Sequence, residues 1–520
     1  MTDRTGPDPI DLLIVGGGVN GCGIARDAAG RGLSVMLVEQ GDLAQATSSA
    51  STKLFHGGLR YLEYFEFRLV REALKEREVL LRNMPHISWP MRFVLPLDPA
   101  MRFESDTPAG RLLAWVMPWL RGRRPSWMIR LGLLAYDNMG GREILPPAGS
   151  LSLSDTPEGA PLKPRFHRAF EYSDCWVQDS RLVVLNARDA AARGARILPR
   201  TRLLRAARDA GIWRAEVQDT DTGTQETVAA RMIVNAAGPW VAQVIHGALG
   251  QNTGDAIRLV RGSHIVTRRL FEHDKCYFFQ GPDGRIIFAI PYEQEFTLIG
   301  TTDQDHPDPD LPPHCTDEER DYLCAFASRY FRQPVTKEDV VWSYSGVRPL
   351  RDDGSASASA ATRDYSLRLD RDGPPALHVF GGKITTYRKL AEAAVAEIGT
   401  VLPTQHGPWT ADAPLPGGDF KVDQVGDRIA RLQADYPFLT PARAQRLFRT
   451  YGTDVWNVLG DARTPADLGI EFGAGLTAAE VEWLRRHEFA RTAEDIIWRR
   501  TRLGLRMTSE QVDDLRAYLG

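Results

Sequence analysis

Three glycines and one acidic residue near the N-terminus have the types and spacing that a dinucleotide site requires. Gly16, Gly18 and Gly21 form a G-x-G-x-x-G pattern after an apolar run, and Glu39 ends the next apolar run. Glycines leave bare backbone that can approach a pyrophosphate, and a helix beginning here offers it unpaired N–H groups. A carboxylate at Glu39 can accept hydrogen bonds from ribose hydroxyls and would repel a 2′-phosphate. The pattern predicts binding of FAD or NAD rather than NADP.

A hydroxyl-rich stretch just past this pattern favours FAD over NAD. The run Ser48–Leu54 can meet diphosphate oxygens and the edge atoms of a flavin. It continues into the run His56–Tyr61, whose glycines allow close backbone approach while Arg60 and Tyr61 can reach a substrate. The alternative is a solvated loop, and these two runs do not decide between the alternatives alone.

The elements that must position these residues form a strand–helix–strand unit. Apolar runs predict strands at Asp11–Val15 and Leu33–Glu39, with a helix at Val19–Arg31 between them. Helical spacing of charged and apolar residues predicts further helices at Phe65–Asn83 and Leu182–Ala192.

Later segments predict two more kinds of structure. Met232–Ala236 is typical of a buried strand, and it leads directly into Gly238. Ile286–Pro291 and Phe296–Gly300 resemble paired antiparallel strands of a separate sheet. After the Pro- and Gly-rich linker Ala413–Gly418, helical patterns continue to the C-terminus without a strand pattern.

These elements predict an α/β protein with three parts. A Rossmann-type FAD-binding domain is expected from residues 1–90, 165–260 and 340–400. An antiparallel-sheet substrate domain is expected from residues 91–164 and 261–339, and an all-helical domain from residues 413–520.

Composition excludes several classes of function. The 520 residues carry a formal net charge of −3 with interspersed signs, so nucleic acid is not an expected partner. The five cysteines never form a C-x-x-C pair, which disfavours a disulfide framework and a zinc site and fits a reducing cytosol. No metal site is expected. The N-terminus lacks a signal-peptide pattern, and the longest apolar run, Leu112–Leu120, is far below the roughly 20 residues that span a bilayer.

Several stretches of the chain resemble one known family. They are Thr47–Glu63 (TSSASTKLFHGGLRYLE), Glu171–Val184 (EYSDCWVQDSRLVV), Asn235–Trp240 (NAAGPW), Arg261–His264 (RGSH), Ser343–Leu350 (SYSGVRPL), Thr362–Tyr365 (TRDY), Phe380–Lys389 (FGGKITTYRK) and Glu488–Leu503 (EFARTAEDIIWRRTRL). Together they resemble the aerobic, respiratory type of FAD-dependent glycerol-3-phosphate dehydrogenase, within the wider D-amino-acid-oxidase-like flavoproteins. The resemblance spans nearly the whole chain and departs mainly at Met101–Arg124, an apparent insertion.

This resemblance implies that FAD is the cofactor. The residues it implies as FAD contacts are Gly16, Gly18, Asn20, Gly21, Glu39, Thr47, Ser48, Ser49, Ser51, Lys53, Leu54, His56, Gly57, Ala237, Gly238, Trp240, Gly381, Gly382, Lys383 and Thr385. The residue pattern agrees at the two glycine-containing strand ends, because glycine lets the end of a strand touch a cofactor.

The resemblance also implies the reaction, which is oxidation of sn-glycerol 3-phosphate to dihydroxyacetone phosphate. Hydride would pass from C2 to flavin N5, and the electrons would pass to a membrane quinone. A phosphomonoester needs two or more converging cations. The candidates are Arg60, Arg348, Arg363 and Lys383, each in or beside one of the matching stretches, with Tyr61 as a further substrate contact.

The oxidation also needs a base for the hydroxyl proton. His264, which opens an apolar run after Gly262 and Ser263, is the first candidate, and on the residues alone a structural role is an equal alternative. The resemblance favours a substrate role. Arg348 can instead orient the alkoxide electrostatically, and His56 is a weaker alternative for the base.

Segment 109–130 has the composition of a membrane-surface element. The apolar run Leu112–Leu120 is flanked by arginines, and Trp127 follows. Such a segment can enter the headgroup region of an anionic membrane, and the alternative is a buried hairpin. We therefore expect a cytoplasmic protein held peripherally on the inner face of the membrane. Glu488–Leu503 is expected to pack on the body, with a homodimer face as the alternative.

Three other functions stay open at this point. The first is an oxidase of the same fold that reduces oxygen instead of quinone. The second is a related flavoenzyme that oxidises an amine or a 2-hydroxy acid, although four cations favour phosphate. The third is a non-redox interaction protein that FAD merely stabilises.

Overall fold

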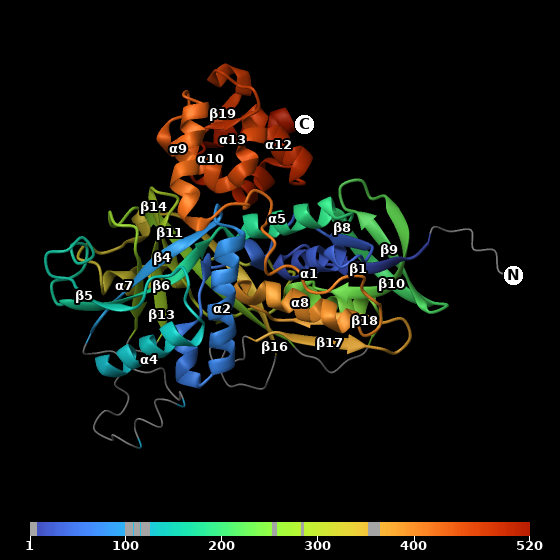
Figure 1. Ribbon diagram of the computed structural model, residues 1–520, viewed down its shortest axis with the longest axis horizontal. Coiled ribbons are helices and arrows are strands. Elements are labelled where there is room, and N and C mark those ends of the chain that lie inside the picture. Colours follow the sequence, from blue (N-terminus) through green and yellow to red (C-terminus); the bar gives the residue numbers. More distant parts are fainter. Residues whose placement is uncertain are drawn as a thin grey trace.

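The computed structural model describes residues 8–98, 108, 115, 125–251, 257–281, 285–351 and 364–520, with only the backbone of Arg60 and Arg351. Two large sheets lie side by side, and a domain of helices stands at one end of the molecule (Figure 1).

The first sheet has eight strands and a parallel centre. Its order is β17 (Ser366–Asp370), β18 (Ala376–Phe380), β10 (Gln225–Asn235), β1 (Ile10–Val15), β2 (Val35–Glu39) and β7 (Arg196–Pro199), and β8 (Thr201–Asp209) and β9 (Ile212–Asp219) extend it from β10.

Both faces of this sheet are covered, as the continuous apolar runs of its strands require. Leu12 and Ile14 face one core, formed with helices α1 (Val19–Gly30), α5 (Asp179–Ala192) and α8 (Tyr387–Ile398). Leu13 and Val15 face the opposite core with the β8–β9 hairpin. The predicted strand–helix–strand unit is confirmed.

The second sheet has ten strands and is mostly antiparallel. Its order is β15 (Gln304–Asp305), β11 (Ile257–Arg268), β14 (Phe296–Gly300), β13 (Ile286–Tyr292), β12 (Cys276–Gln280), β4 (Ser88–Pro96), β6 (Arg168–Val177) and β3 (Leu54–Phe55), with β16 (Val340–Arg351) beside β11 and β5 (Gly149–Ser152) beside β6. Helices α2 (Phe67–Asn83) and α4 (Ser126–Met139) pack on one face, and α7 (Asp317–Ser328) packs on the other.

Three of these strands, β3, β6 and β16, fall in ranges that the sequence assigned to the FAD-binding domain, and β3 pairs with β6. β6 pairs with β4, and β16 pairs with β11 along nearly its whole length, so all three belong to the second sheet. An apolar strand pattern shows that a strand is buried but not which sheet it joins. The sheets therefore divide the chain differently from the predicted boundaries.

The C-terminal domain has a core of its own. It contains α9 (Val425–Asp435), α10 (Pro441–Tyr451), α11 (Val455–Leu459), α12 (Ala478–His487) and α13 (Ser509–Leu519). The side chains of Thr440 and Thr508 cap α10 and α13. A short hairpin, β19 (Glu471–Gly473) and β20 (Leu476–Thr477), corrects the expectation of helices alone, because such brief strands carry no periodic pattern.

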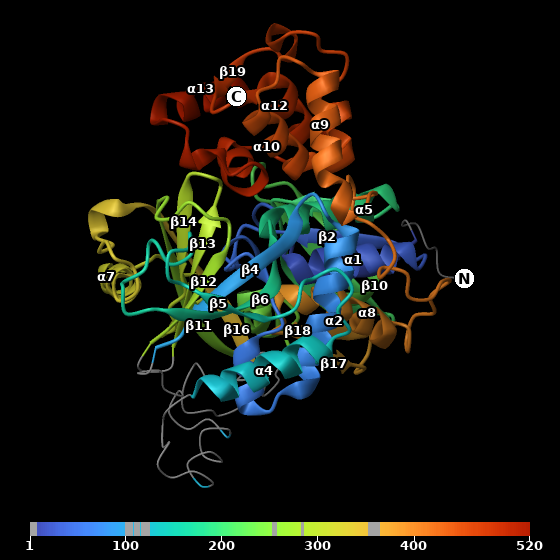
Figure 2. The same cartoon turned by 60° about the vertical axis from the view of Figure 1, so that its left-hand side comes forward.

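The C-terminal domain and α4 lie at opposite ends of the molecule in both views (Figures 1 and 2). None of the helices in the described part of the chain has both the length and the apolar composition needed to cross a membrane.

Candidate functional site

A cavity of about 660 Å³ lies at one edge of the first sheet. Strands β1, β2, β10 and β18 run parallel, and their carboxyl ends meet at this edge. Open α/β sheets bind their ligands at such an edge. The lining includes Gly16, Gly18, Asn20, Glu39, Thr47, Ser48, Ala237, Gly238, Trp240, Gly381 and Gly382, all of which were predicted from the sequence to contact a cofactor.

The three glycines of the first loop differ in why a side chain would not be tolerated at each position. Gly16 has a φ of +114°, and a Cβ there would lie 2.5 Å from the carbonyl oxygen of Ala236. A Cβ at Gly21 would lie 1.9 Å from the carbonyl oxygen of Gly16. A Cβ at Gly18 would meet, among the described residues, only the Ser48 hydroxyl oxygen at 3.1 Å. The loop itself needs the first and third glycines, whereas Gly18 leaves space in the cavity.

Glu39 is held by backbone on both sides. One carboxylate oxygen accepts from Gly17 N at 2.6 Å, and the other accepts from Gly41 N at 2.8 Å. Burial raises the pKa of this carboxyl above its ordinary value, against the lowering effect of these two hydrogen bonds. Each oxygen retains a lone pair, so the fixed carboxylate can still accept from ribose hydroxyls.

The predicted hydroxyl stretch begins in contact with the glycine loop. Ser48 Oγ accepts from Val19 N at 3.0 Å, in the first turn of α1. Thr47 Oγ1 donates to the carbonyl oxygen of Val347 at 2.6 Å. Ser49 completes the same short 3₁₀ turn, Thr47–Ser49. These contacts join α1, the hydroxyl stretch and β16 at the cavity.

Ser51 and Lys53 have a common partner in α5. Lys53 Nζ lies 2.8 and 3.0 Å from the two carboxylate oxygens of Asp179, and Ser51 Oγ donates to the same carboxylate at 2.8 Å. Burial and then the charge of Arg502 lower the pKa of Lys53 to about 8, while Asp179 opposes them. The contact of these two side chains with FAD stays a prediction.

The turn after β18 lies against α1. Gly381 and Gly382 have φ values of +68° and +100°, a left-handed conformation that favours glycine. Asn20 Nδ2 donates to the carbonyl oxygen of Gly381 at 3.1 Å. The turn after β10 has the same character, because Gly238 has a φ of +57°. Both strand ends therefore present bare backbone to the cavity.

The stretch after β3 is fixed by three neighbours. Leu54 pairs with β6 inside the second sheet. His56 N donates to Thr385 Oγ1 at 3.3 Å, and Gly57 N donates to the Tyr136 hydroxyl at 2.7 Å. This stretch thus connects the second sheet with the 3₁₀ turn Ile384–Thr386 and with α4, which carries Tyr136.

Two of the predicted substrate residues come together. Lys383 Nζ lies 3.6 Å from the centroid of the Tyr61 ring. Arg60 lies in the 3₁₀ helix Leu59–Tyr64 with Tyr61. Arg363 lies outside the described residues. Residues that are distant in sequence therefore place a cation and a phenol beside the glycine turn.

His264 is almost completely buried in β11. Its Nε2 lies 2.9 Å from Thr52 Oγ1, and its ring stacks on Tyr344 at 4.7 Å between centroids. Its Nδ1 is buried without a hydrogen-bond partner among the described residues. Burial, followed by the charges of Arg348 and Lys53, lowers the pKa of this imidazole well below its ordinary value. The ring is neutral, and within the described part of the chain its Nδ1 is buried and unsatisfied.

Two glycines make room for His264 and Arg348. A Cβ at Gly300 would lie 2.1 Å from His264 Cδ2, and one at Gly262 would lie 2.2 Å from an Arg348 guanidinium nitrogen. Since Gly262 and His264 share a face of β11, the arginine and the histidine are neighbours. Arg348 also forms an ion pair with Asp303.

The sequence-based predictions missed several of these contacts. Thr52, Thr301 and Asp303 bond to the two predicted catalytic side chains, and Gly262 and Gly300 make the space for them. Thr301 and Asp303 could have been found from the sequence, because they are polar residues that directly follow the predicted strand Phe296–Gly300. Nothing in the sequence distinguishes Thr52 from the other hydroxyl residues of the run Ser48–Leu54.

Comparison with known families finds two matches along the chain. Residues 11–388 match the family described as FAD dependent oxidoreductase. Residues 408–517 match the C-terminal domain of alpha-glycerophosphate oxidase.

Relatives in bacteria are similar over almost their whole length. Aerobic glycerol-3-phosphate dehydrogenase of Escherichia coli is 45% identical over 511 residues, which cover 98% of this chain and 97% of the relative. D-erythritol 1-phosphate dehydrogenase of Brucella abortus is 47% identical, covering 97% of this chain and 96% of the relative. The solved structure of glycerol-3-phosphate dehydrogenase from Bacillus halodurans, complexed with FAD, has a TM-score of 0.71 at 25% identity, covering 98% and 94% of the two chains.

Proposed function

Since the chain belongs to the family of FAD-dependent oxidoreductases, we propose that it oxidises sn-glycerol 3-phosphate to dihydroxyacetone phosphate. The observation that carries the proposal is the buried His264, whose Nδ1 has no hydrogen-bond partner among the described residues and which lies beside the charge of Arg348. The cavity edge fits FAD, because a helix N-terminus, bare glycine backbone and a fixed carboxylate meet there.

FAD held at this edge by the glycine loop and Glu39 would supply the oxidant for the hydride of C2. His264 takes the hydroxyl proton at Nδ1. This nitrogen can accept a proton when Nε2 carries the ring's N–H and donates a hydrogen bond to Thr52 Oγ1. Arg348 stabilises the negative charge that develops on the alcohol oxygen. Lys383 and Arg348, with Arg60 and Arg363, bind the phosphate dianion.

Anaerobic reduction of the flavin by substrate tests this assignment directly. We expect glycerol 3-phosphate to bleach the flavin absorbance, whereas glycine and lactate leave it unchanged. Bleaching by an amine or a 2-hydroxy acid would show that the enzyme acts on that substrate class instead. No bleaching by any of them would contradict an oxidoreductase acting on these substrates.

A second candidate substrate is D-erythritol 1-phosphate. The relative from Brucella abortus that acts on it is as similar to this chain as the glycerol-3-phosphate dehydrogenases are. Both substrates carry a phosphomonoester, so the cations suit either one. The ratio of the two kcat/KM values decides between them, and an excess for erythritol 1-phosphate would replace our first choice.

Replacing Lys383 by Met tests the phosphate contact. We expect KM for glycerol 3-phosphate to rise roughly tenfold to a hundredfold with FAD content intact, since a hydrogen bond to a charged group contributes about 1.5–3 kcal/mol. Lys389→Met is the matched control, because Lys389 lies on the following helix and forms an ion pair with Glu392. Equal KM values in the two variants would remove Lys383 from the substrate site.

The apolar run Leu112–Leu120 of the predicted membrane segment lies outside the described residues, apart from Trp115. From the helix that follows it, we also propose that the end of the molecule bearing α4 docks on a membrane surface, where a quinone accepts the electrons. Trp127, Leu131 and Leu134 share one face of α4 and are 49%, 59% and 52% exposed. Phe65 and Phe67, at the start of α2 nearby, are exposed as well. A cluster of large apolar side chains on the solvent-exposed surface of a protein is typical of an interaction site.

Replacing Trp127, Leu131 and Leu134 together by Ser tests this surface. We expect liposome cosedimentation and quinone reduction to fall severalfold, while activity with a soluble dye survives because none of these three exposed side chains lines the cavity. The matched control changes Leu311, Val341 and Ile470, which are comparably exposed elsewhere, to Ser. Liposome binding that is equal in both triple variants would contradict the proposed surface. Peroxide formation during turnover would identify oxygen as the acceptor instead.

A further inference from the structure

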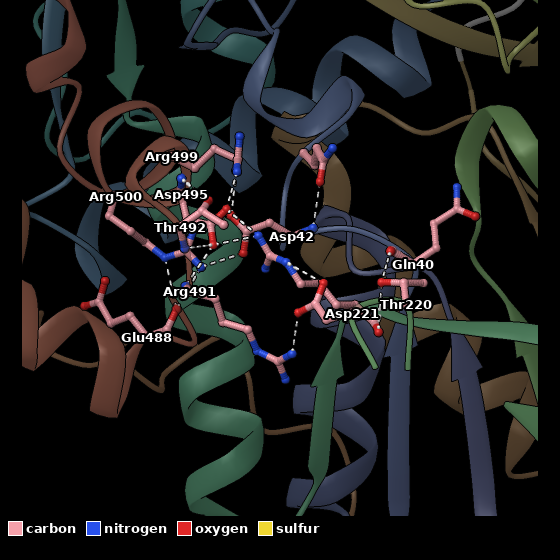
Figure 3. Close-up of polar contacts among 12 residues, drawn as sticks. Gln40, Asp42, Thr220, Asp221, Glu488, Arg491, Thr492, Asp495, Arg499 and Arg500 are labelled. Atoms are coloured by element: carbon pink, nitrogen blue, oxygen red, sulfur yellow. Dashed lines mark hydrogen bonds and ion pairs between the residues drawn. The ribbon is translucent and has the colours of Figure 1, made fainter. Parts of the chain in front are cut away.

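A buried ion-pair network joins the C-terminal domain to the loop that follows Glu39. Asp42, in that loop, is fully buried and accepts from Arg500 through two parallel hydrogen bonds of 2.8 Å (Figure 3). Arg499 donates to the same carboxylate at 2.5 Å. The Arg500 guanidinium also donates to the carbonyl oxygen of Glu488, at 2.8 Å. Two cations from the C-terminal domain therefore converge on one acid of the cavity loop.

A second connection leads from the same domain to the Glu39 carboxylate. Asp495 accepts from the Arg200 guanidinium at 2.9 Å. The backbone N–H of Arg200 donates to the carbonyl oxygen of Gly41 at 2.8 Å. The N–H of Gly41 in turn donates to Glu39 at 2.8 Å. Each step is a normal hydrogen bond, so the position of Glu39 depends on Asp495 through two intermediates.

Asp495 is well suited to hold this connection. Its carboxylate also accepts from the backbone N–H groups of Arg491 and Thr492, at 2.9 and 3.0 Å. Burial raises the pKa of Asp495, but the hydrogen bonds from Arg200 and the two backbone groups outweigh burial and lower it below the ordinary value. Asp495 is therefore ionised and fixed.

A third connection reaches the far end of the loop. Arg502 donates to Asp179 at 2.7 Å, and Asp179 holds both Lys53 and Ser51. Arg502, Asp179 and Lys53 are all buried. The C-terminal domain thus contacts the loop Gln40–Lys53 near its beginning and, through α5, at its end.

We propose that the segment Glu488–Arg502 is a positioning element for FAD: through Asp42, Arg200 and Asp179 it fixes the loop that lines the cofactor cavity. A loop that is already fixed loses less conformational freedom when a ligand binds, so binding is tighter. The inference rests on the FAD site proposed above. It adds that residues of the C-terminal domain, none of which lines the cavity, set the rate at which FAD leaves.

Arg499→Gln tests the proposal with a matched control. Arg499 pairs with Asp42 and Asp495, and its side chain is 14% exposed. Arg188 pairs with Asp454 at 3.0 Å across the same interface, and its side chain is 13% exposed. It also lies 3.4 Å from Glu488, which keeps its closer ion pair with Arg181, and neither partner of Arg188 belongs to the cavity loop. Arg188→Gln therefore removes an equivalent interfacial cation without touching the loop.

The primary measurement is the rate of FAD release, followed by the rise in flavin fluorescence after dilution of the holoenzyme. We expect Arg499→Gln to release FAD at least tenfold faster than the wild type, and Arg188→Gln to stay within twofold. Thermal unfolding of both apoproteins measures the general destabilisation and should give similar midpoints for the two variants. Equal rates of FAD release from the two variants would overturn the proposal.

Asp42→Asn is the stronger variant and should release FAD still faster. It leaves the buried Arg500 and the partly buried Arg499 without their shared acid, so it destabilises the fold more than Arg499→Gln does. If it does not fold, the comparison of Arg499→Gln with Arg188→Gln still decides. Failure of glycerol 3-phosphate to bleach the flavin would count against the proposed substrate and would leave the release rates unaffected.

Discussion

A Gly18→Val variant is expected to purify as a folded but colourless protein. The Gly18 backbone is extended, with φ −82° and ψ −177°, which any residue adopts, and its nearest neighbour would be Ser48 Oγ. A branched side chain there fits the fold but extends into the cavity, on the path of the pyrophosphate. We therefore expect loss of retained FAD, with apoprotein stability within about 1 kcal/mol of the wild type. Flavin absorbance and thermal unfolding measure the two effects.

Gly21→Val provides the contrasting control. A Cβ at Gly21 would lie 1.9 Å from the Gly16 carbonyl oxygen, so any side chain there must displace the loop backbone. This variant should lose stability as well as FAD, whereas Gly18→Val should lose FAD alone. A yellow Gly18→Val protein would show that the pyrophosphate does not pass this position.

His264→Ala is expected to lower kcat by roughly a hundredfold or more, the usual scale for removing a general base. FAD content should be unchanged, since His264 does not line the cavity described above. Stopped-flow measurement of flavin reduction isolates the chemical step from later steps. Added imidazole should restore part of the rate, because the lost side chain leaves space beside Tyr344.

The pH dependence separates a base from a positioning residue. The pKa of His264 is lowered by burial and by the Arg348 charge, so the imidazole stays neutral, and able to accept a proton, below pH 6.5. The kcat of the wild type at saturating substrate should therefore stay level from pH 8 to about pH 6. A mild, pH-independent loss in His264→Ala, without rescue by imidazole, would give His264 a positioning role only.

The parts of the site that were predictable from sequence are local. The glycine loop and Glu39 follow from a short pattern whose strand, helix and strand are contiguous, and the structure places them at one cavity. The glycines after β10 and β18 were predictable for the same reason. Each pattern needed only a strand and the turn that follows it.

The remaining parts depend on pairings between distant segments. Lys53 lies in a hydroxyl-rich stretch that suggests a cofactor contact, but its partner Asp179 lies 126 residues away. The space for His264 comes from Gly300 on the neighbouring strand, and the register of two strands cannot be read from either alone. No sequence pattern marks Asp42 as part of the site, because its role depends on an ion pair with Arg500 in the C-terminal domain.

The hydrogen bonds between Asp42 and Arg500 span 458 positions of the chain, and this has a consequence for biosynthesis. The ribosome makes the glycine loop before β10, which pairs with β1, and before β18, which pairs with β10, although the turns after both strands line the cavity; Arg500 comes later still. Pairings between such distant segments form slowly. A nascent chain therefore has no finished cavity to offer, and we expect flavin to be incorporated only after translation of the C-terminal domain is complete.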